Sequence, residues 1–121
     1  MVGRIYKTGW FTKAARKAHI SDSDLREAIR QVAEGKVDDL GGGVFKKRLK
    51  DNRHRSIVLA HAGQFWVFAY LFAKQDRANI DEAELAAFKA LAALYRKKTA
   101  VDIETELRTG ALVEVDHDDE G

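Results

Sequence analysis

Residues 55–80 read RSIVLAHAGQFWVFAYLFAKQDRANI, with two apolar segments separated by a short turn. Residues 56–60 and 65–72 are rich in branched and aromatic side chains, which is typical of β-strands. Residues 62–64 are Ala-Gly-Gln, which predicts a tight hairpin between the two strands. Because residues 65–72 are apolar at both odd and even positions, this strand is expected to be covered on both faces and to lie centrally in its sheet.

Two helices are predicted before this stretch, after a short extended piece at residues 4–7. Apolar side chains recur at helical spacing over residues 10–18 and again over residues 25–32. Ser21 and Asp22 form a helix start, and Gly35 ends the second helix. A short turn near Ile20 joins the pair.

A further strand is predicted at residues 44–49, directly after three consecutive glycines. A phosphate-binding loop needs a preceding strand and a following Lys-Ser/Thr with a helix, so we interpret Gly41-Gly42-Gly43 as a flexible connection from helix to strand. Asp81 predicts the start of a long helix, Thr99 starts a short one that Gly110 closes, and residues 112–115 suggest a last strand. The order predicts an α+β domain in which the two N-terminal helices pack on a small antiparallel sheet, with extra C-terminal helices.

The composition narrows the protein class. The chain has 121 residues, of which 45% are hydrophobic, and it contains no Cys and no Pro. This length predicts one domain over residues 1–115, followed by an acidic, disordered tail at residues 116–121. Without Cys there are no disulfides, thiolate zinc sites or cysteine nucleophiles. The longest apolar run, residues 65–73, is about half of what a membrane helix needs, so we expect a cytoplasmic domain without membrane contact.

The net charge of +2 hides an asymmetry along the chain. Residues 1–77 hold 16 Lys and Arg against 8 Asp and Glu, whereas residues 78–121 hold 5 against 11. A basic body with an acidic end favours a polyanionic partner, although a mixed charged surface also serves solubility alone.

The cations concentrate on the predicted strands. Alternation along a strand places Lys46 and Arg48 on one face and Lys47 on the other, while Arg55 shares the face of Ile57. Like charges held across neighbouring strands repel each other, so an anion is their natural counterpart. The alternative is that the lysines lie on a solvated edge strand and prevent it from pairing with another chain. The candidate anion-binding residues are Lys46, Lys47, Arg48, Lys50, Arg53 and Arg77.

Two of the four histidines, His54 and His61, flank the middle predicted strand. Imidazoles near neutral pH are candidates for proton transfer, and exposed histidines at strand ends are the structural alternative. None of the histidines has the paired spacing of a zinc helix, so we expect neither a metal nor another cofactor.

Residues 55–80 resemble the RelE/ParE toxin superfamily, and more closely its phage Gp49-like and HigB-like branch. That branch typically carries aromatic-Arg-Thr at the start of one strand and Phe-Ala-Lys-x-x-Arg-x-Asn-Ile at the end of the next. The likeness covers nearly the whole chain. Its motifs here are Asp39-Leu40-Gly41-Gly42-Gly43-Val44-Phe45-Lys46-Lys47-Arg48, Arg55-Ser56-Ile57-Val58-Leu59, Phe72-Ala73-Lys74-Gln75-Asp76-Arg77-Ala78-Asn79-Ile80 and Thr109-Gly110-Ala111-Leu112-Val113-Glu114-Val115.

The resemblance implies the toxin of a type II toxin–antitoxin pair, with mRNA and the ribosome as targets and a helix-turn-helix antitoxin encoded in the adjacent gene as partner. The best-known members cleave mRNA in the ribosomal A site without metal, with the RNA 2′-OH as nucleophile. Such chemistry needs a base, cations for the developing phosphorane charge, and an acid for the leaving oxygen. The resemblance assigns Arg55 and Lys74 to this work, and it assigns RNA binding to the candidate anion-binding residues named above. Arg77 matches a motif position too, with anchoring of the turn into the long helix as its alternative role.

The chain departs from the branch around its expected active site. The Gly-rich loop is replaced by Asp51-Asn52-Arg53, and His54 stands where the aromatic residue is usual. Our hypothesis is that His54 or His61 takes over proton transfer. The alternative functions are a ParE-like toxin that acts on DNA gyrase without nuclease activity, and a catalytically weak relative that binds nucleic acid or antitoxin.

Overall fold

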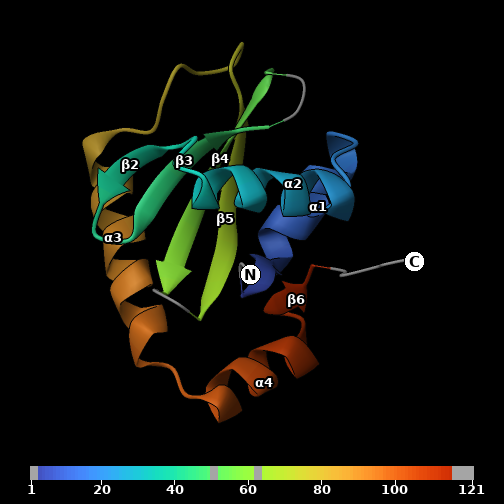
Figure 1. Cartoon of the computed structure of the whole chain (residues 1–121), viewed down its shortest axis with the longest axis vertical. Coiled ribbons are helices and arrows are strands. Elements are labelled where there is room, and N and C mark those ends of the chain that lie inside the picture. Colours follow the sequence, from blue (N-terminus) through green and yellow to red (C-terminus); the bar gives the residue numbers. More distant parts are fainter. Residues whose placement is uncertain (1–2, 50–51, 62–63, 116–121) are drawn as a thin grey trace.

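The computed structural model describes residues 3–49, 52–61 and 64–115, which form a six-stranded sheet with helices packed on its two faces (Figure 1). The predictions for Lys50, for the hairpin residues 62 and 63 and for the tail at 116–121 lie outside these residues. In chain order the elements are β1 (Arg4–Thr8), α1 (Gly9–Lys17), α2 (Asp22–Ala33), β2 (Asp38–Gly41), β3 (Val44–Arg48), β4 (His54–His61), β5 (Phe65–Ala73), α3 (Glu82–Lys97), α4 (Ala100–Thr109) and β6 (Leu112–Glu114).

The sheet has the strand order β2-β3-β4-β5-β1-β6, so β5 is an interior strand as predicted. Strands β2 to β5 form an antiparallel meander, and β6 is antiparallel to β1. Strand β1, however, runs parallel to β5. The α+β class is confirmed, and the expectation of an antiparallel sheet holds for every pairing except that of β1 with β5. The reason is connectivity: α1 and α2 carry the chain away from β1, and the meander then returns β5 beside β1 in the same direction.

The glycine segment forms part of a β-hairpin, which corrects its interpretation as a helix-to-strand connection. Gly41 pairs with Val44 at an irregularity that ends β2, and Gly42 and Gly43 make the turn into β3. Both turn residues have positive φ, 62° and 82°, which suits the tight turns that join antiparallel strands. Strand β2 was not predicted because it is a short edge strand with a single large apolar residue, Leu40, and an edge needs no alternating apolar face.

Alternation along β4 builds a core on each face of the sheet. Val58 points into the cluster that holds α1 and α2, where Phe11, Leu25 and Phe68 are fully buried. Ile57 points the other way, into the cluster that joins the sheet to α3 and α4. The sheet is therefore the middle layer, with the N-terminal helix pair on one side and the C-terminal helices on the other.

Three helix starts predicted from single residues are confirmed by their caps. Ser21, Asp81 and Thr99 each accept a hydrogen bond from the backbone N–H three residues on, and the acidic residue at that position bonds back to the N–H of the cap. These capping boxes satisfy backbone donors that the first helical turn leaves free.

Phe11→Ala tests the core under α1. The ring of Phe11 is fully buried and packs on Phe68 with 5.2 Å between the ring centroids. Its removal is expected to lower the free energy of unfolding by about 3–5 kcal/mol, measured by urea denaturation. Leu94→Ala, at a side chain that is 52% exposed, is the control and should change it by no more than about 0.5 kcal/mol. Equal effects of the two substitutions would contradict the packing described.

Candidate functional site

Four cations gather at one end of the sheet, where β3 and β5 end and β4 begins. Arg48 and Arg55 are direct partners across β3 and β4. The backbone N–H of Lys74 donates to the carbonyl of Arg53 at 2.7 Å, which fixes the residue after β5 beside the residue before β4. We call Arg48, Arg53, Arg55 and Lys74 the basic rim.

The basic rim is open to a ligand. Arg48, Arg53 and Lys74 are exposed, and within the described part of the chain Arg48 and Lys74 form no ion pair. The guanidinium of Arg55 is half-buried and donates to the carbonyl oxygens of Asn52 at 3.1 Å and His54 at 3.4 Å. These bonds to neutral oxygens orient the Arg55 guanidinium and leave its charge available to an anion.

A groove runs beside the rim, between α1 and the end of β5. Strand β1 pairs with β5 only as far as Phe68, and α1 crosses the remaining edge of β5. The groove has a volume of about 620 Å³. We call it the α1 groove; its polar and aromatic lining residues are Trp10, Lys13, Lys17, His54, Tyr70, Phe72, Asp76 and Arg77.

A β-bulge shapes the wall of the α1 groove. The register between β4 and β5 shifts from Ile57 opposite Tyr70 to Val58 opposite Phe68, so Ala69 is an extra residue. The bulge brings Tyr70 to the open edge of β5, where its ring stacks on Trp10 with 5.0 Å between centroids.

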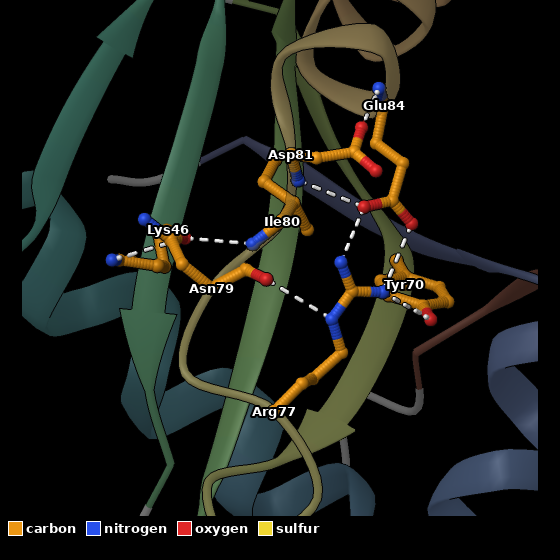
Figure 2. Close-up of polar contacts among 7 residues, drawn as sticks. All are labelled: Lys46, Tyr70, Arg77, Asn79, Ile80, Asp81 and Glu84. Atoms are coloured by element: carbon orange, nitrogen blue, oxygen red, sulfur yellow. Dashed lines mark hydrogen bonds and ion pairs between the residues drawn. The ribbon is translucent and has the colours of Figure 1, made fainter.

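Arg77 anchors the chain between β5 and α3 (Figure 2). Its guanidinium forms an ion pair with both oxygens of Glu84 in the first turn of α3, and it donates to the Tyr70 hydroxyl at 3.4 Å and to the Asn79 carbonyl at 3.0 Å. Glu84 also accepts the N–H of Asp81 at 2.9 Å. The bonds from Arg77 lower the pKa of the Glu84 carboxyl. This geometry corresponds to the anchoring role considered for Arg77, and its assignment to RNA binding stays a prediction.

Two further predicted RNA-binding lysines are engaged in the fold. The ammonium of Lys46 donates to the side-chain oxygen of Asn79 at 3.3 Å (Figure 2). The same ammonium lies 3.9 Å from the carboxylate of Asp38. Lys47 faces the opposite side of the sheet and is buried, and burial, followed by the nearby charges of Lys36 and Arg48, lowers the pKa of its ammonium. Their roles toward RNA stay predictions.

The two candidate histidines lie at opposite ends of β4. His54 lines the α1 groove and pairs with Ala73 next to Lys74. His61 pairs with Phe65 at the other end, with 5.0 Å between the two rings. At a strand rise of roughly 3.3 Å per residue the two histidines are about 20 Å apart. The fold thus places Arg55, Lys74 and His54 at the same end of the sheet, with His54 and Arg55 on opposite faces of β4 by strand alternation, and it leaves His61 at the other end.

Helix α1 contributes residues to the site that were not among the predicted site residues. Lys13 and Lys17 are cations at helical spacing within residues 10–18, and this spacing is a sufficient signal for a basic surface on the first helix. Trp10 was interpreted as a member of the apolar stripe, although it is 53% exposed. Its partner Tyr70 depends on the bulge in β5, which the apolar run of residues 65–72 does not reveal.

A model of the family described as the RelE toxin of the RelE/RelB toxin–antitoxin system matches residues 3–115. No curated protein and no solved structure matches the chain significantly. Among residues 3–49, 52–61 and 64–115, no helix is long and apolar enough to cross a bilayer. The same residues contain no cluster of three or more His, Asp or Glu side chains arranged as metal ligands.

Glu84→Gln tests the anchor. The substitution keeps an oxygen for the N–H of Asp81 but removes the charge that faces Arg77. Because the pKa of Glu84 is lowered in the fold, its ion pair stabilises the protein above the ordinary glutamate pKa and is lost as the pH falls through the lowered value. Glu84→Gln is therefore expected to have a lower melting temperature than the wild type at about pH 7, and this difference should vanish below about pH 4. The measurement is thermal denaturation followed by circular dichroism.

Glu82→Gln is the control for the anchor test, since Glu82 is an exposed residue in the same first turn of α3. Its melting temperature should stay close to that of the wild type over the same pH range. If the melting temperature of Glu84→Gln differed from that of the wild type by the same amount at every pH, the ion pair would not be the cause of the difference.

Proposed function

The chain belongs to the RelE family of toxins from toxin–antitoxin systems, and from this premise we propose that it is a ribosome-dependent mRNA endonuclease that stops translation. Within the family we place it in the HigB-like and Gp49-like branch, on the motifs around Gly41-Gly42-Gly43 and Lys74. RelE-family toxins are generally endoribonucleases. We propose that this chain acts in the cytoplasm, where mRNA and ribosomes are found.

The observation that carries the proposal is the gathering of the four cations of the basic rim at one end of the sheet, the end at which His54 begins β4. A phosphodiester in the transition state of cleavage carries extra negative charge on its non-bridging oxygens, and preorganised cations stabilise that charge. Arg55 and Lys74 are held at the ends of paired strands, so their positions are set before the substrate binds. Arg48 and Arg53 extend the same surface toward neighbouring phosphates.

The proposed reaction is an internal transfer. The ribose 2′-oxygen attacks the adjacent phosphorus, the bond from phosphorus to the 5′-oxygen breaks, and the products carry a 2′,3′-cyclic phosphate and a 5′-hydroxyl. One proton leaves the 2′-OH and one is delivered to the departing 5′-oxygen. Arg55 stabilises the phosphorane, Lys74 supplies a second positive charge, and the imidazole of His54 carries a proton.

The proposed partner that controls this activity is an antitoxin with a helix-turn-helix domain, encoded beside the toxin. The basic rim and the α1 groove are the surfaces that an acidic antitoxin segment would neutralise, because they bring together cations that form no ion pair in the described residues, namely Lys13, Lys17, Arg48, Arg55 and Lys74. Occupation of this surface would exclude RNA by competition.

Expression without an antitoxin is expected to arrest growth and to leave mRNA cut within codons. Arg55→Ala and Lys74→Ala should each slow cleavage in a purified ribosome assay by about 100-fold or more, because each removes a charge from the transition-state site. Lys97→Ala, an exposed cation at the end of α3, is the matched control and should cleave like the wild type. DNA-damage signalling with intact mRNA would instead support the gyrase-directed alternative.

The two histidines of β4 allow a second comparison. His54→Ala is expected to reduce cleavage by about 100-fold, because the proposed mechanism gives its imidazole a proton to carry. His61→Ala, at the far end of the same strand, is expected to have a much smaller effect. Equal rates for His54→Ala and wild type in single-turnover cleavage would remove His54 from the mechanism.

A further inference from the structure

We propose that Trp10 is a base-stacking platform in the α1 groove, and that Lys13 and Lys17 bind the backbone of the same single-stranded RNA. The proposal deepens the proposed function, on which it rests, by naming how the substrate strand is held next to the basic rim. It concerns binding and positioning, and it assigns no catalytic step to Trp10.

The indole ring of Trp10 is partly open to solvent. The side chain is 53% exposed although its ring is stacked on Tyr70 at an interplanar angle of 23°. The Tyr70 contact therefore accounts for only part of the indole surface, and the rest lies open to solvent. An aromatic ring with an accessible surface in a basic groove is the arrangement by which proteins stack bases of single-stranded nucleic acid.

The stacked pair of Trp10 and Tyr70 is held in place by its neighbours. Behind Trp10, the Tyr70 ring packs on Phe72 at 6.0 Å and on Phe88 of α3 at 5.8 Å. The hydroxyl of Tyr70 also accepts a hydrogen bond from Arg77 (Figure 2). A base that stacks on Trp10 thus joins an ordered aromatic column, and little side-chain freedom is lost on binding.

Two lysines of α1 line the groove together with Trp10. Lys13 and Lys17 are three and seven residues after Trp10, so they lie on the same face of α1 at successive turns. Both are exposed, and neither forms an ion pair within the part of the chain that the structure describes. Across the groove stands His54, next to the basic rim. An RNA strand along α1 therefore reaches the rim with its bases on Trp10 and its phosphates on lysine.

Stacking alone accepts any base, because every base has a π-face. Trp10 is therefore expected to set the affinity for an unpaired strand rather than to choose a particular base. Double-stranded RNA should be excluded from the platform, since its bases are already stacked on each other.

The test uses tryptophan fluorescence of the full chain. The protein has two tryptophans, so Trp66→Phe leaves Trp10 as the only indole. This variant is titrated with a single-stranded oligoribonucleotide that is 2′-O-methylated throughout, which blocks cleavage, and with the same sequence as a duplex. We expect the single strand to quench the fluorescence of Trp10, and we expect the duplex to leave that fluorescence unchanged. Absence of quenching at concentrations that saturate binding would overturn the proposal.

Substitutions separate stacking from charge in the same titration, followed by anisotropy of a labelled strand. Trp10→Ala should weaken binding by roughly tenfold or more, and Trp10→Tyr should retain most of the affinity. The double substitution Lys13→Ala and Lys17→Ala should weaken binding. It should also make the slope of log K against log salt concentration less negative by about 0.7 for each phosphate contact that is lost. Leu94→Ala, an exposed apolar residue on α3, is the control, and each variant is checked by thermal melting. Wild-type affinity in Trp10→Ala would contradict a stacking role.

The outcome also distinguishes this inference from the proposed function. Quenching and a loss of affinity in Trp10→Ala, in a chain that does not cut mRNA on ribosomes, would refute the nuclease and leave the stacking platform in place. Cleavage of mRNA by Trp10→Ala at the wild-type rate and with unchanged RNA affinity would refute the platform and leave the nuclease in place.

Discussion

The pairing of β5 is the constraint on which the rest of the molecule depends. Along its whole length β5 bonds to β4, but on its other edge it bonds to β1 only as far as Phe68. The chain leaves β1 there and enters α1, which crosses the remaining edge. This early exit creates the α1 groove, and the bulge at Ala69 brings Tyr70 to its wall. The interior strand that holds the fold together is therefore also the strand that shapes the candidate site.

The loop after β5 is held by one ion pair with several consequences. Arg77 bonds to Glu84, and Glu84 at the same time completes the capping box of α3 with Asp81. The start of α3, the end of β5 and the ring of Tyr70 are thus fixed relative to each other. Lys46 adds a link from β3 through Asn79. Charges that look alike in a sequence thus have two uses: some join elements of the fold, and others stay open to a polyanion.

That division explains which site residues a sequence can predict. Lys46, Lys47, Arg48 and Arg55 are all cations in predicted strands, but their surroundings differ. Lys47 is buried and Lys46 is bonded to Asn79, whereas Arg48 is exposed. Strand alternation separated Lys46 from Lys47 correctly. It gave no information on which cation meets a polar partner, because such partners come from distant parts of the chain.

The sequence by itself determined the helix starts at Ser21, Asp81 and Thr99, the strands β3, β4 and β5, and the family to which the chain belongs. Capping and alternation act between residues that are near in sequence, so a local pattern is enough to reveal them. Only the tertiary structure decided the parallel pairing of β1 with β5, the position of Lys74 beside Arg53, and the stacking of Trp10 on Tyr70. Each depends on where strands that are distant in sequence meet, and on a register shift that no local pattern records.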